Sequence, residues 1–260
     1  MGMSYGAYLK LDQLLRLQEP LSDGPEHDEL LFIVVHQVYE LWFKETLHEL
    51  DYLERALEAR DAPRALHTMK RVLTVLKVVV AQVDVLETMT PLEFLSFRER
   101  LASGSGFQSV QFRELEFALG MKNPKALERY PEGSNERIAL ERRYRAPSIW
   151  DAFLRYLRAE GHPVPDDVLA RDLTCPIEPD PRVQAILIAI YRARGTTSEL
   201  CERLVDLDEG LQEWRYRHVK MVERTIGAKP GTGGSSGVAY LTTTLHRAAF
   251  PDLWAIRSQL

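Results

Sequence analysis

Two histidines stand where a helix would normally bury only apolar side chains, and the first of them is His218. A neutral imidazole in a water-poor pocket is what a haem iron requires of its axial ligand. The alternative is a core histidine whose ring is satisfied by a hydrogen bond to a neighbouring carbonyl. The apolar residues that share the helical stripe of His218 are Leu211, Trp214, Met221 and Ile226.

The second histidine, His36, lies on another apolar stripe. Within residues 26–57, Phe32, His36 and Phe43 fall at i, i+4 and i+11, so they share one helix face. Two histidines on two buried stripes predict the two sides of one pocket. Neither has the spacing of a zinc site, and the sequence has no CxxCH motif for covalent haem attachment. A haem in this pocket would therefore be b-type and held non-covalently.

The elements that must position these residues are helices. Apolar residues recur with helical periodicity from residue 7 onward, without the two-residue alternation of strands bounded by hairpin turns. The sequence therefore predicts an all-α fold, with residues 1–260 forming a single domain around three long helices. We expect long helices at 26–57, 63–88 and 198–226, and shorter ones at 91–102, 109–119, 134–145, 148–160, 181–194 and 238–247.

Several helix ends have a specific chemical signal. Thr90 followed by Glu93 has the order of a capping box, and Ser148 with Asp151 is a weaker version of the same start. Gly227 follows the last apolar turn of the helix that carries His218, where a left-handed C-cap is expected. The boundaries of the helices that bear the candidate site are thus predicted by capping chemistry as well as by periodicity.

The net charge of −5 argues against a nucleic-acid-binding protein, because binding phosphates needs a concentrated excess of Lys and Arg. Two local basic clusters are most simply interpreted as solvated helix faces. They consist of Arg142, Arg143 and Arg145, and of Arg215, Arg217 and Lys220.

Nothing in the sequence predicts a membrane span or a secretory signal. The longest uninterrupted apolar stretch, Leu30 to Val35, is far shorter than the roughly 18 residues that cross a bilayer. Residues 1–10 lack the apolar core of a signal peptide. The only cysteines, Cys175 and Cys201, form no disulfide framework and are expected to be ordinary thiols. We therefore expect a cytoplasmic protein.

Two segments rich in small residues mark possible binding loops. Residues 231–237 read Gly-Thr-Gly-Gly-Ser-Ser-Gly, and they form either a flexible connector or a lid whose amides and Thr232 hydroxyl bind a carboxylate. A second such turn, residues 103–107, follows the helix that carries Arg98. The planar guanidinium of Arg98 suits bidentate carboxylate binding, although a surface salt bridge is the simpler alternative.

Taken together, these residues resemble the tryptophan 2,3-dioxygenase family, whose haem enzymes open the indole ring of L-tryptophan to N-formylkynurenine. The resemblance runs from Tyr5 to near the C-terminus. Its blocks are His36 to Lys44, then Phe94, Phe97 and Arg98, then Ser105 to Ser109, then Trp214, Arg215 and His218, and finally Gly231 to Gly237.

The resemblance implies a cofactor site built around His218, which matches the proximal ligand of the haem iron. Ser105 and Gly106 match residues at the edge of the haem, and Trp214 belongs to the same cofactor-binding block. The implied cofactor is haem b, with O2 as co-substrate.

The same resemblance implies the residues that bind the substrate. His36 matches a distal histidine beside the indole nitrogen, and Phe32 and Phe94 match walls of the indole pocket. Arg98 would bind the substrate carboxylate, and Thr232 would bind the ammonium and carboxylate groups as the glycine-rich loop closes. One position varies within the family: where this chain has Phe94, some members have tyrosine, whose hydroxyl adds a donor to the carboxylate.

Tyr5, Tyr8 and Leu9 match an N-terminal segment that completes the pocket of a neighbouring subunit. The resemblance therefore implies a homotetramer in which residues 1–20 reach across to another copy.

The implied chemistry is the insertion of both oxygen atoms across the indole C2–C3 bond, the first step of the kynurenine route of tryptophan catabolism. This chemistry needs no strong acid or base, so His36 is better interpreted as an orienting partner than as a general base. A monooxygenase of an indole derivative or another aromatic amino acid fits the same scaffold. A haem sensor without turnover is an alternative of another class, because pocket residues indicate binding and not rate.

Overall fold

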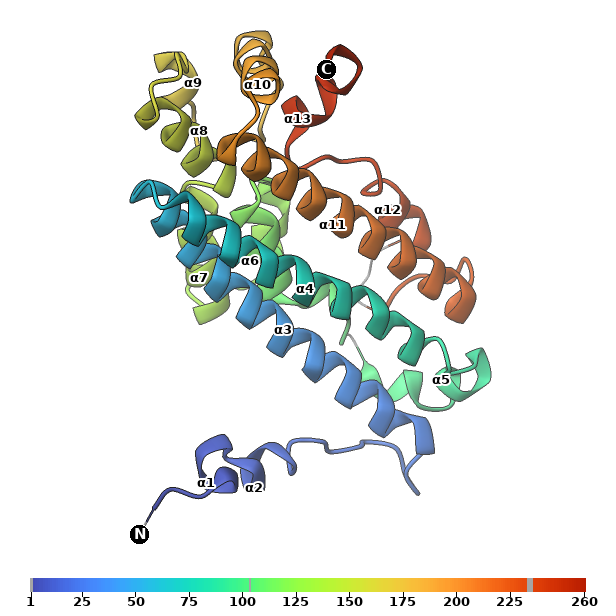
Figure 1. Ribbon diagram of the computed structural model, residues 1–260. Coiled ribbons are helices and arrows are strands. Elements are labelled where there is room, and N and C mark those ends of the chain that lie inside the picture. The colour runs from blue at the N-terminus through green and yellow to red at the C-terminus, as the bar shows by residue number, and fades with distance from the viewer. Residues whose placement is uncertain (1, 103, 233–235) are drawn as a thin grey trace.

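The computed structural model describes residues 2–102, 104–232 and 236–260, and every regular element within them is a helix. The prediction of an all-α fold is therefore confirmed. Three long helices lie side by side in one layer, with α4 packed against both α3 and α11 (Figure 1). They are α3 (His27–Glu58), α4 (Ala62–Leu86) and α11 (Thr196–Ile226), each within two residues of the predicted bounds.

Shorter helices gather around both ends of this layer (Figure 1). Those that the periodicity predicted are α5 (Pro91–Arg98) with the 3-10 turn η1 (Glu99–Leu101), α6 (Val110–Ala118), α7 (Asn135–Arg145), α8 (Ile149–Ala159), α10 (Pro181–Ala193) and α12 (Val238–Thr242). Those whose bounds it did not give are α1 (Tyr5–Leu9), α2 (Leu11–Leu14), η2 (Gly106–Gln108), η3 (Pro124–Arg129), α9 (Asp166–Leu169), α13 (Pro251–Ala255) and η4 (Arg257–Gln259).

The prediction of a helix over 238–247 is wrong in its second half, because α12 ends at Thr242. Thr242, Thr243 and Thr244 each donate their hydroxyl to a carbonyl three or four residues earlier. These local bonds compete with the helical ladder, and β-branched side chains favour helix weakly. The chain continues in tight turns over 243–246.

The capping boxes are confirmed where they position the site. In α5 the Glu93 carboxylate accepts the Thr90 N–H at 2.6 Å, while the Thr90 hydroxyl accepts the Glu93 N–H at 3.4 Å. Ser148 and Asp151 form the same reciprocal pair at the start of α8. Gly227 ends α11 with a positive φ of 59°, which costs glycine little, but its ψ of −136° differs from that of the left-handed C-cap that the sequence predicted.

The three long helices are held by a continuous hydrophobic core. Helix α4 buries a stripe that includes Ala65, Met69 and Val72, whose spacing of three and four residues keeps them on one face. Helix α11 approaches α4 closely at Gly210, where a Cβ atom would lie only 2.7 Å from Cδ2 of Leu76. This packing fixes α11, and with it His218, against the rest of the layer.

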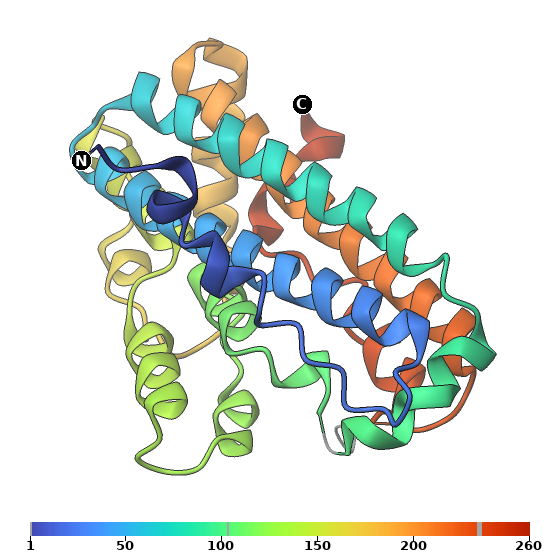
Figure 2. The ribbon, with the colours of Figure 1, turned by 90° about the horizontal axis from the view of Figure 1, so that it is seen from below.

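The N-terminal segment runs along the outer side of α3 (Figures 1 and 2). Gln18 and Gln37 are joined by a side-chain hydrogen bond, and Glu29 accepts the N–H groups of Leu21 and Ser22. The tip of the segment is hardly packed, because Tyr5 is 76% exposed.

No helix in the described ranges combines the length and the apolar character needed to cross a membrane. Both cysteines are free thiols, as expected: Cys201 is buried and Cys175 is exposed.

Candidate functional site

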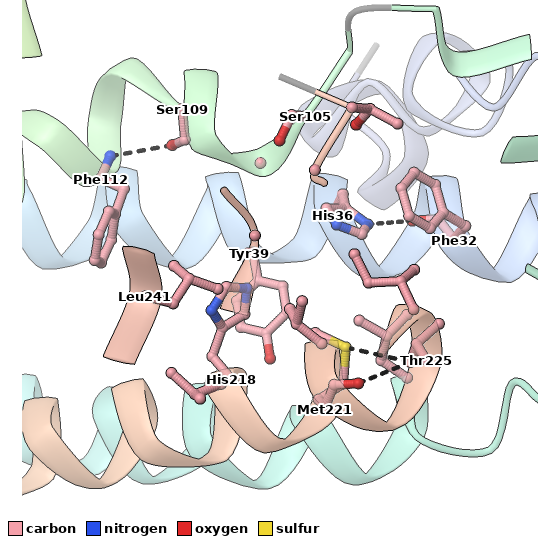
Figure 3. A pocket seen from close by; sticks show the side chains of 18 of the residues that line it. Phe32, His36, Tyr39, Ser105, Ser109, Phe112, His218, Met221, Thr225 and Leu241 are labelled. Atoms are coloured by element: carbon pink, nitrogen blue, oxygen red, sulfur yellow. Dashed lines mark hydrogen bonds between the residues drawn. The ribbon is translucent and has the colours of Figure 1, made fainter. Parts of the chain in front are cut away.

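One large cavity opens between α3, α5, α6, α11 and α12. His36 on α3 and His218 on α11 project into it from opposite sides, with Ser105 and Ser109 along one wall (Figure 3). Most of the lining is apolar and aromatic. The apolar lining residues are Phe32, Tyr39, Phe43, Leu86, Met89, Phe94, Leu101, Phe112, Trp214, Val219, Met221, Val222, Ile226, Tyr240 and Leu241.

The ring of His36 is oriented by its own helix. Its Nδ1 lies 2.7 Å from the carbonyl oxygen of Phe32, one turn earlier. A carbonyl can only accept, so Nδ1 carries the proton and Nε2 of the neutral ring is an acceptor. Burial lowers the pKa of His36 and outweighs the opposite effects of the Phe32 carbonyl and the Glu40 carboxylate. The cavity thus contains a neutral imidazole with an acceptor nitrogen.

His218 has different surroundings. Its ring stacks on Trp214, one turn earlier on α11, with centroids 5.2 Å apart and planes 10° from parallel. It has no hydrogen-bonding partner among the residues that the structure describes. Burial, with smaller contributions from the nearby His36 and Arg113, lowers the pKa of His218 to about 4. His218 is therefore a neutral imidazole at neutral pH, open to the cavity.

Aromatic rings form the wall beside His36. The ring of Phe32 lies 4.0 Å from that of His36 and 5.8 Å from that of Phe94, and Phe94 meets Phe97 edge to face. Capping of α5 by Thr90 fixes the helix that carries Phe94 and Phe97. The result is a flat-sided apolar pocket next to an acceptor nitrogen, which suits an aromatic ligand with an N–H group.

Arg98 and Thr232 both lie at the polar rim of this pocket. The Arg98 guanidinium donates to the carbonyl of Pro230 at 2.6 Å, and the Thr232 hydroxyl donates to the carbonyl of Gly104 at 2.7 Å. Among the residues that the structure describes, Arg98 has no acidic partner within salt-bridge distance, so the simpler alternative of a surface salt bridge is wrong there. These two bonds tie the loop after α11 to the turn after α5, and both donors line the cavity.

Gly237 explains part of the unusual composition of residues 231–237. It has a φ of +62°, and a Cβ atom there would lie 2.7 Å from the Lys229 carbonyl oxygen. The backbone of the chain itself thus approaches this segment closely. Residues 233–235 of the segment, and Ser103 of the other turn, lie outside the described residues.

The structure brings together almost all of the site residues that the sequence predicts. One cavity is lined by His36, Phe32, Phe94, Arg98, Thr232, Ser105, Gly106, Trp214 and His218. Tyr5, Tyr8 and Leu9 do not line it, since they lie on the exposed N-terminal segment.

The two basic clusters were interpreted as solvated helix faces. In each cluster this interpretation is wrong for one residue, which is Arg215 in one and Arg143 in the other. Arg215 is buried, and it donates to the Glu116 carboxylate at 2.8 Å and to the Thr244 carbonyl at 3.3 Å. Arg143 is mostly buried against Asp51. Both were assigned by local charge density, which does not reveal a partner on a distant helix.

A polar part of the cavity wall, formed by α6 and α11, was missed by the sequence analysis. It consists of Arg113, Glu116 and Arg215, all of which line the cavity. The sequence contained a signal for this wall. Phe112, Arg113 and Glu116 follow the N-cap Ser109 by three, four and seven residues, which places them on one face of the helix.

The residues of this cavity fit a b-type haem. His218 supplies a neutral, half-buried imidazole without a hydrogen-bonding partner in the described chain, and the walls around it are mostly apolar. In residues 2–102, 104–232 and 236–260, no group of three His, Cys, Asp or Glu side chains is placed to bind a metal ion by itself. His218 would therefore be the residue that holds the haem iron.

Comparison with known proteins identifies the family. The family model for tryptophan 2,3-dioxygenase matches residues 1–138 and 180–260, which contain every residue that lines the cavity. The tryptophan 2,3-dioxygenase of Herpetosiphon aurantiacus is 60% identical over 100% of this chain and 99% of its own length. Those of an Anaeromyxobacter species and of Caulobacter vibrioides are 56% and 45% identical, over 100% and 99% of this chain and 97% and 98% of their own lengths. The chain therefore belongs to the tryptophan 2,3-dioxygenase family.

Proposed function

We propose that this protein is a haem-dependent dioxygenase that inserts both atoms of O2 across the indole C2–C3 bond of L-tryptophan. The product is N-formylkynurenine, which makes this the first step of the kynurenine route. His218 would hold haem b from the α11 side, and the bound haem iron supplies the activation of O2. The observation that carries the proposal is the placement of two neutral histidines on opposite sides of one apolar cavity.

The substrate would be held by complementary groups at two ends of the pocket. Phe32 and Phe94 would enclose the indole ring, and Nε2 of His36 would accept its N–H. The Arg98 guanidinium would bind the carboxylate in place of the Pro230 carbonyl, and the Thr232 hydroxyl would bind the amino-acid head group in place of the Gly104 carbonyl. Fixing both ends aligns the C2–C3 bond for reaction.

The role of His36 follows from its tautomer. With Nδ1 committed to the Phe32 carbonyl, Nε2 can accept a hydrogen bond without taking a proton in the ground state. Its lowered pKa makes it a weak base. His36 therefore orients the indole, while the apolar walls exclude water from the reacting atoms.

The experiment is an oxygen-labelling assay on the haem-loaded, reduced protein. With L-tryptophan and 18O2, mass spectrometry is expected to find N-formylkynurenine that contains two labelled oxygen atoms. A hydroxylated product with one labelled atom and an intact ring would instead identify a monooxygenase. A stable oxygen complex that persists in the presence of tryptophan would identify a haem sensor.

We also propose that the chain functions as a homotetramer, with residues 1–20 packing on a neighbouring subunit. The support is the exposure of apolar side chains on this segment: Tyr5 is 76%, Tyr8 72% and Leu15 72% exposed in the single chain. Tyr5, Tyr8 and Leu9 would then complete the neighbour's substrate pocket. Light scattering at micromolar concentration is expected to give four times the chain mass, and a monomer there would contradict the proposal.

A further inference from the structure

The carboxylate of Asp208 is buried in the interior of the protein, outside the cavity described above. It lies on α11, is only 1% exposed and does not line the cavity. Its hydrogen-bond partners in the described chain are all uncharged donors. A buried carboxylate without a cationic partner is costly unless hydrogen bonds stabilise it. The donors around Asp208 therefore show what this residue holds in place.

Most of these donors come from one segment near the C-terminus. Oδ2 of Asp208 accepts the backbone N–H groups of Ala249 at 2.9 Å and Phe250 at 3.0 Å, and the indole N–H of Trp254 at 2.9 Å. The fourth donor, the side-chain amide of Gln212, belongs to α11 itself and reaches Oδ1 at 3.0 Å. Hydrogen bonds to a charged acceptor are stronger than those between neutral groups. One oxygen atom thus attaches the start of α13 to the middle of α11.

The chain just before this attachment forms part of the cavity wall. Tyr240, Leu241 and Thr244 line the cavity, and Leu241 projects toward the ring of His218 (Figure 3). Helix α12 is only five residues long and contains no buried residue, so its own packing holds it weakly. Since few residues separate this wall from Ala249, the place where Ala249 is attached limits where the wall can lie.

The segment is fixed to α11 at a second point. One amino group of Arg215 donates to the Thr244 carbonyl at 3.3 Å. Asp208 and Arg215 are seven residues apart, which is close to two helical turns, so they lie on the same face of α11. Beyond the attachment the chain is deeply packed, since Phe250 and Leu253 are fully buried in the main core. Asp208 therefore lies at the boundary between a thinly packed cavity wall and a firmly packed C-terminal segment.

A second buried carboxylate, Asp252, provides a comparison within the same segment. It is also 1% exposed, and it accepts the backbone N–H of Asp180 at 2.8 Å and the side-chain amide of Gln184 at 2.9 Å. These bonds tie α13 to α10, and none of the three residues lines the cavity. Asp208 and Asp252 thus have the same chemistry and burial, but only Asp208 lies next to the cavity wall.

We infer that Asp208 is a positioning residue for the wall that α12 and the turn after it contribute to the cavity. By holding Ala249 and Phe250 on α11, it keeps Tyr240 and Leu241 against the space beside His218. The inference rests on the proposed function only in taking haem as the ligand that this wall supports. Replacing the carboxylate is expected to loosen the wall without altering any side chain that lines the cavity.

The first test is amide hydrogen exchange on the haem-free protein, followed by mass spectrometry of peptides that cover residues 238–248. Asp208→Asn keeps the shape of the side chain but removes its charge, and exchange in these peptides is expected to become about tenfold faster or more. The matched control Asp252→Asn is expected to leave them unchanged. Urea unfolding of both variants measures the loss of overall stability that each substitution causes.

The second test is a haem titration of the apoproteins, with Kd measured from the haem absorption band. Asp208→Asn is expected to raise Kd about tenfold, because hydrogen bonds to a charged group that hold the wall are lost. Asp252→Asn is expected to stay within about twofold of the wild type, even where its loss of overall stability is similar. A purely structural role of Asp208 would affect both variants in the same way.

The outcomes separate this inference from the proposed function. If the wild type does not bind haem, the haem proposal fails, and the exchange rates still decide whether Asp208 holds the wall. Unchanged exchange over 238–248 in Asp208→Asn, equally faster exchange in both variants, or an unchanged Kd in Asp208→Asn each overturn the inference.

A milder pair of variants decides the question if circular dichroism shows that Asp208→Asn does not fold. Trp254→Phe removes one donor from Asp208, and Gln184→Met removes one donor from Asp252. Trp254→Phe is expected to speed exchange over 238–248 several-fold, and Gln184→Met to leave it unchanged. Equal exchange rates in the two variants overturn the inference.

Discussion

His36 and His218 are the same side chain on two long helices of one cavity, and they differ in how the rings are held. His36 donates Nδ1–H to the carbonyl of Phe32 in its own helix, so its tautomer is fixed. His218 stacks on Trp214 and has no hydrogen-bonding partner in the described chain. Burial lowers the pKa of both, so charge does not distinguish them. The difference in partners is what makes one histidine suited to orient a ligand and the other to bind a metal.

The largest expected effect comes from removing the ring of His218. His218→Ala is expected to lose most of its haem, because the axial ligand is removed and no other histidine lies on that side of the cavity among the described residues. The haem-to-protein ratio of the purified variant measures this. His36→Ala is the control and is expected to keep its haem; a fully ligated haem in His218→Ala would contradict the comparison.

A smaller effect is expected at the substrate rim, where neither histidine is involved. Arg98→Lys keeps the charge but loses the bidentate geometry, so KM for L-tryptophan is expected to rise by about tenfold or more. Tryptamine, which has no carboxylate, is the control substrate, and its kinetics are expected to be the same in wild type and variant. An equal loss with both substrates would show that Arg98 supports the fold and does not bind the carboxylate.

The stability of the haem-free protein is expected to depend on pH, and this dependence tests whether His218 is as poorly solvated as its lowered pKa indicates. The pKa of His218 is about 4 in the folded chain and about 6.5 when unfolded, so the unfolded state binds more protons between these values. Stability is therefore expected to fall as the pH is lowered through this window, by about 2 kcal/mol between pH 7 and pH 5. Urea unfolding of the apoprotein measures this change.

His218→Gln is the matched variant for that titration. It cannot take up the proton, so its stability is expected to fall less between pH 7 and pH 5. His36 contributes in the same direction, since its pKa is lowered too. A pH dependence identical to that of the wild type would mean that His218 is solvated in the apoprotein.

Removing the ring of His36 is expected to lower turnover without affecting haem. If its role is one neutral hydrogen bond to the indole N–H, kcat/KM of His36→Ala falls about two- to tenfold, which corresponds to about 0.5 to 1.5 kcal/mol. A loss of more than a hundredfold would instead indicate general base catalysis. As a control, 1-methyltryptophan lacks the N–H, so the variant and the wild type are expected to differ less with it.

The smallest effect is expected beside the ring of His36, at Phe94. Phe94→Tyr adds a hydroxyl near the rim where Arg98 lies, and one added neutral hydrogen bond to the carboxylate is expected to lower KM a few-fold at most. The haem-to-protein ratio is expected to stay the same. A raised KM would show that the hydroxyl does not reach the carboxylate.

Helical periodicity and capping residues were enough to predict the architecture, because each acts within a few residues of the chain. The three long helices and the capping boxes at Thr90 and Ser148 appear where the sequence indicated them. The predicted end of α12 was wrong because local signals compete there. The hydroxyls of three consecutive threonines donate to carbonyls three or four residues earlier, and the helix ends early.

The candidate site was predictable only in part from the residues themselves. The sequence alone determined that His36 and His218 each lie on an apolar helix face, and the family resemblance supplied the expected roles. Only the tertiary structure decided that Arg98 meets Pro230, 132 residues away, and that Thr232 meets Gly104, 128 residues away. It also decided that Arg215 is buried against Glu116 and not solvated. The reason is physical: periodicity fixes which side a residue faces, but the partner of a buried charge is chosen by helices that pack together from distant parts of the chain.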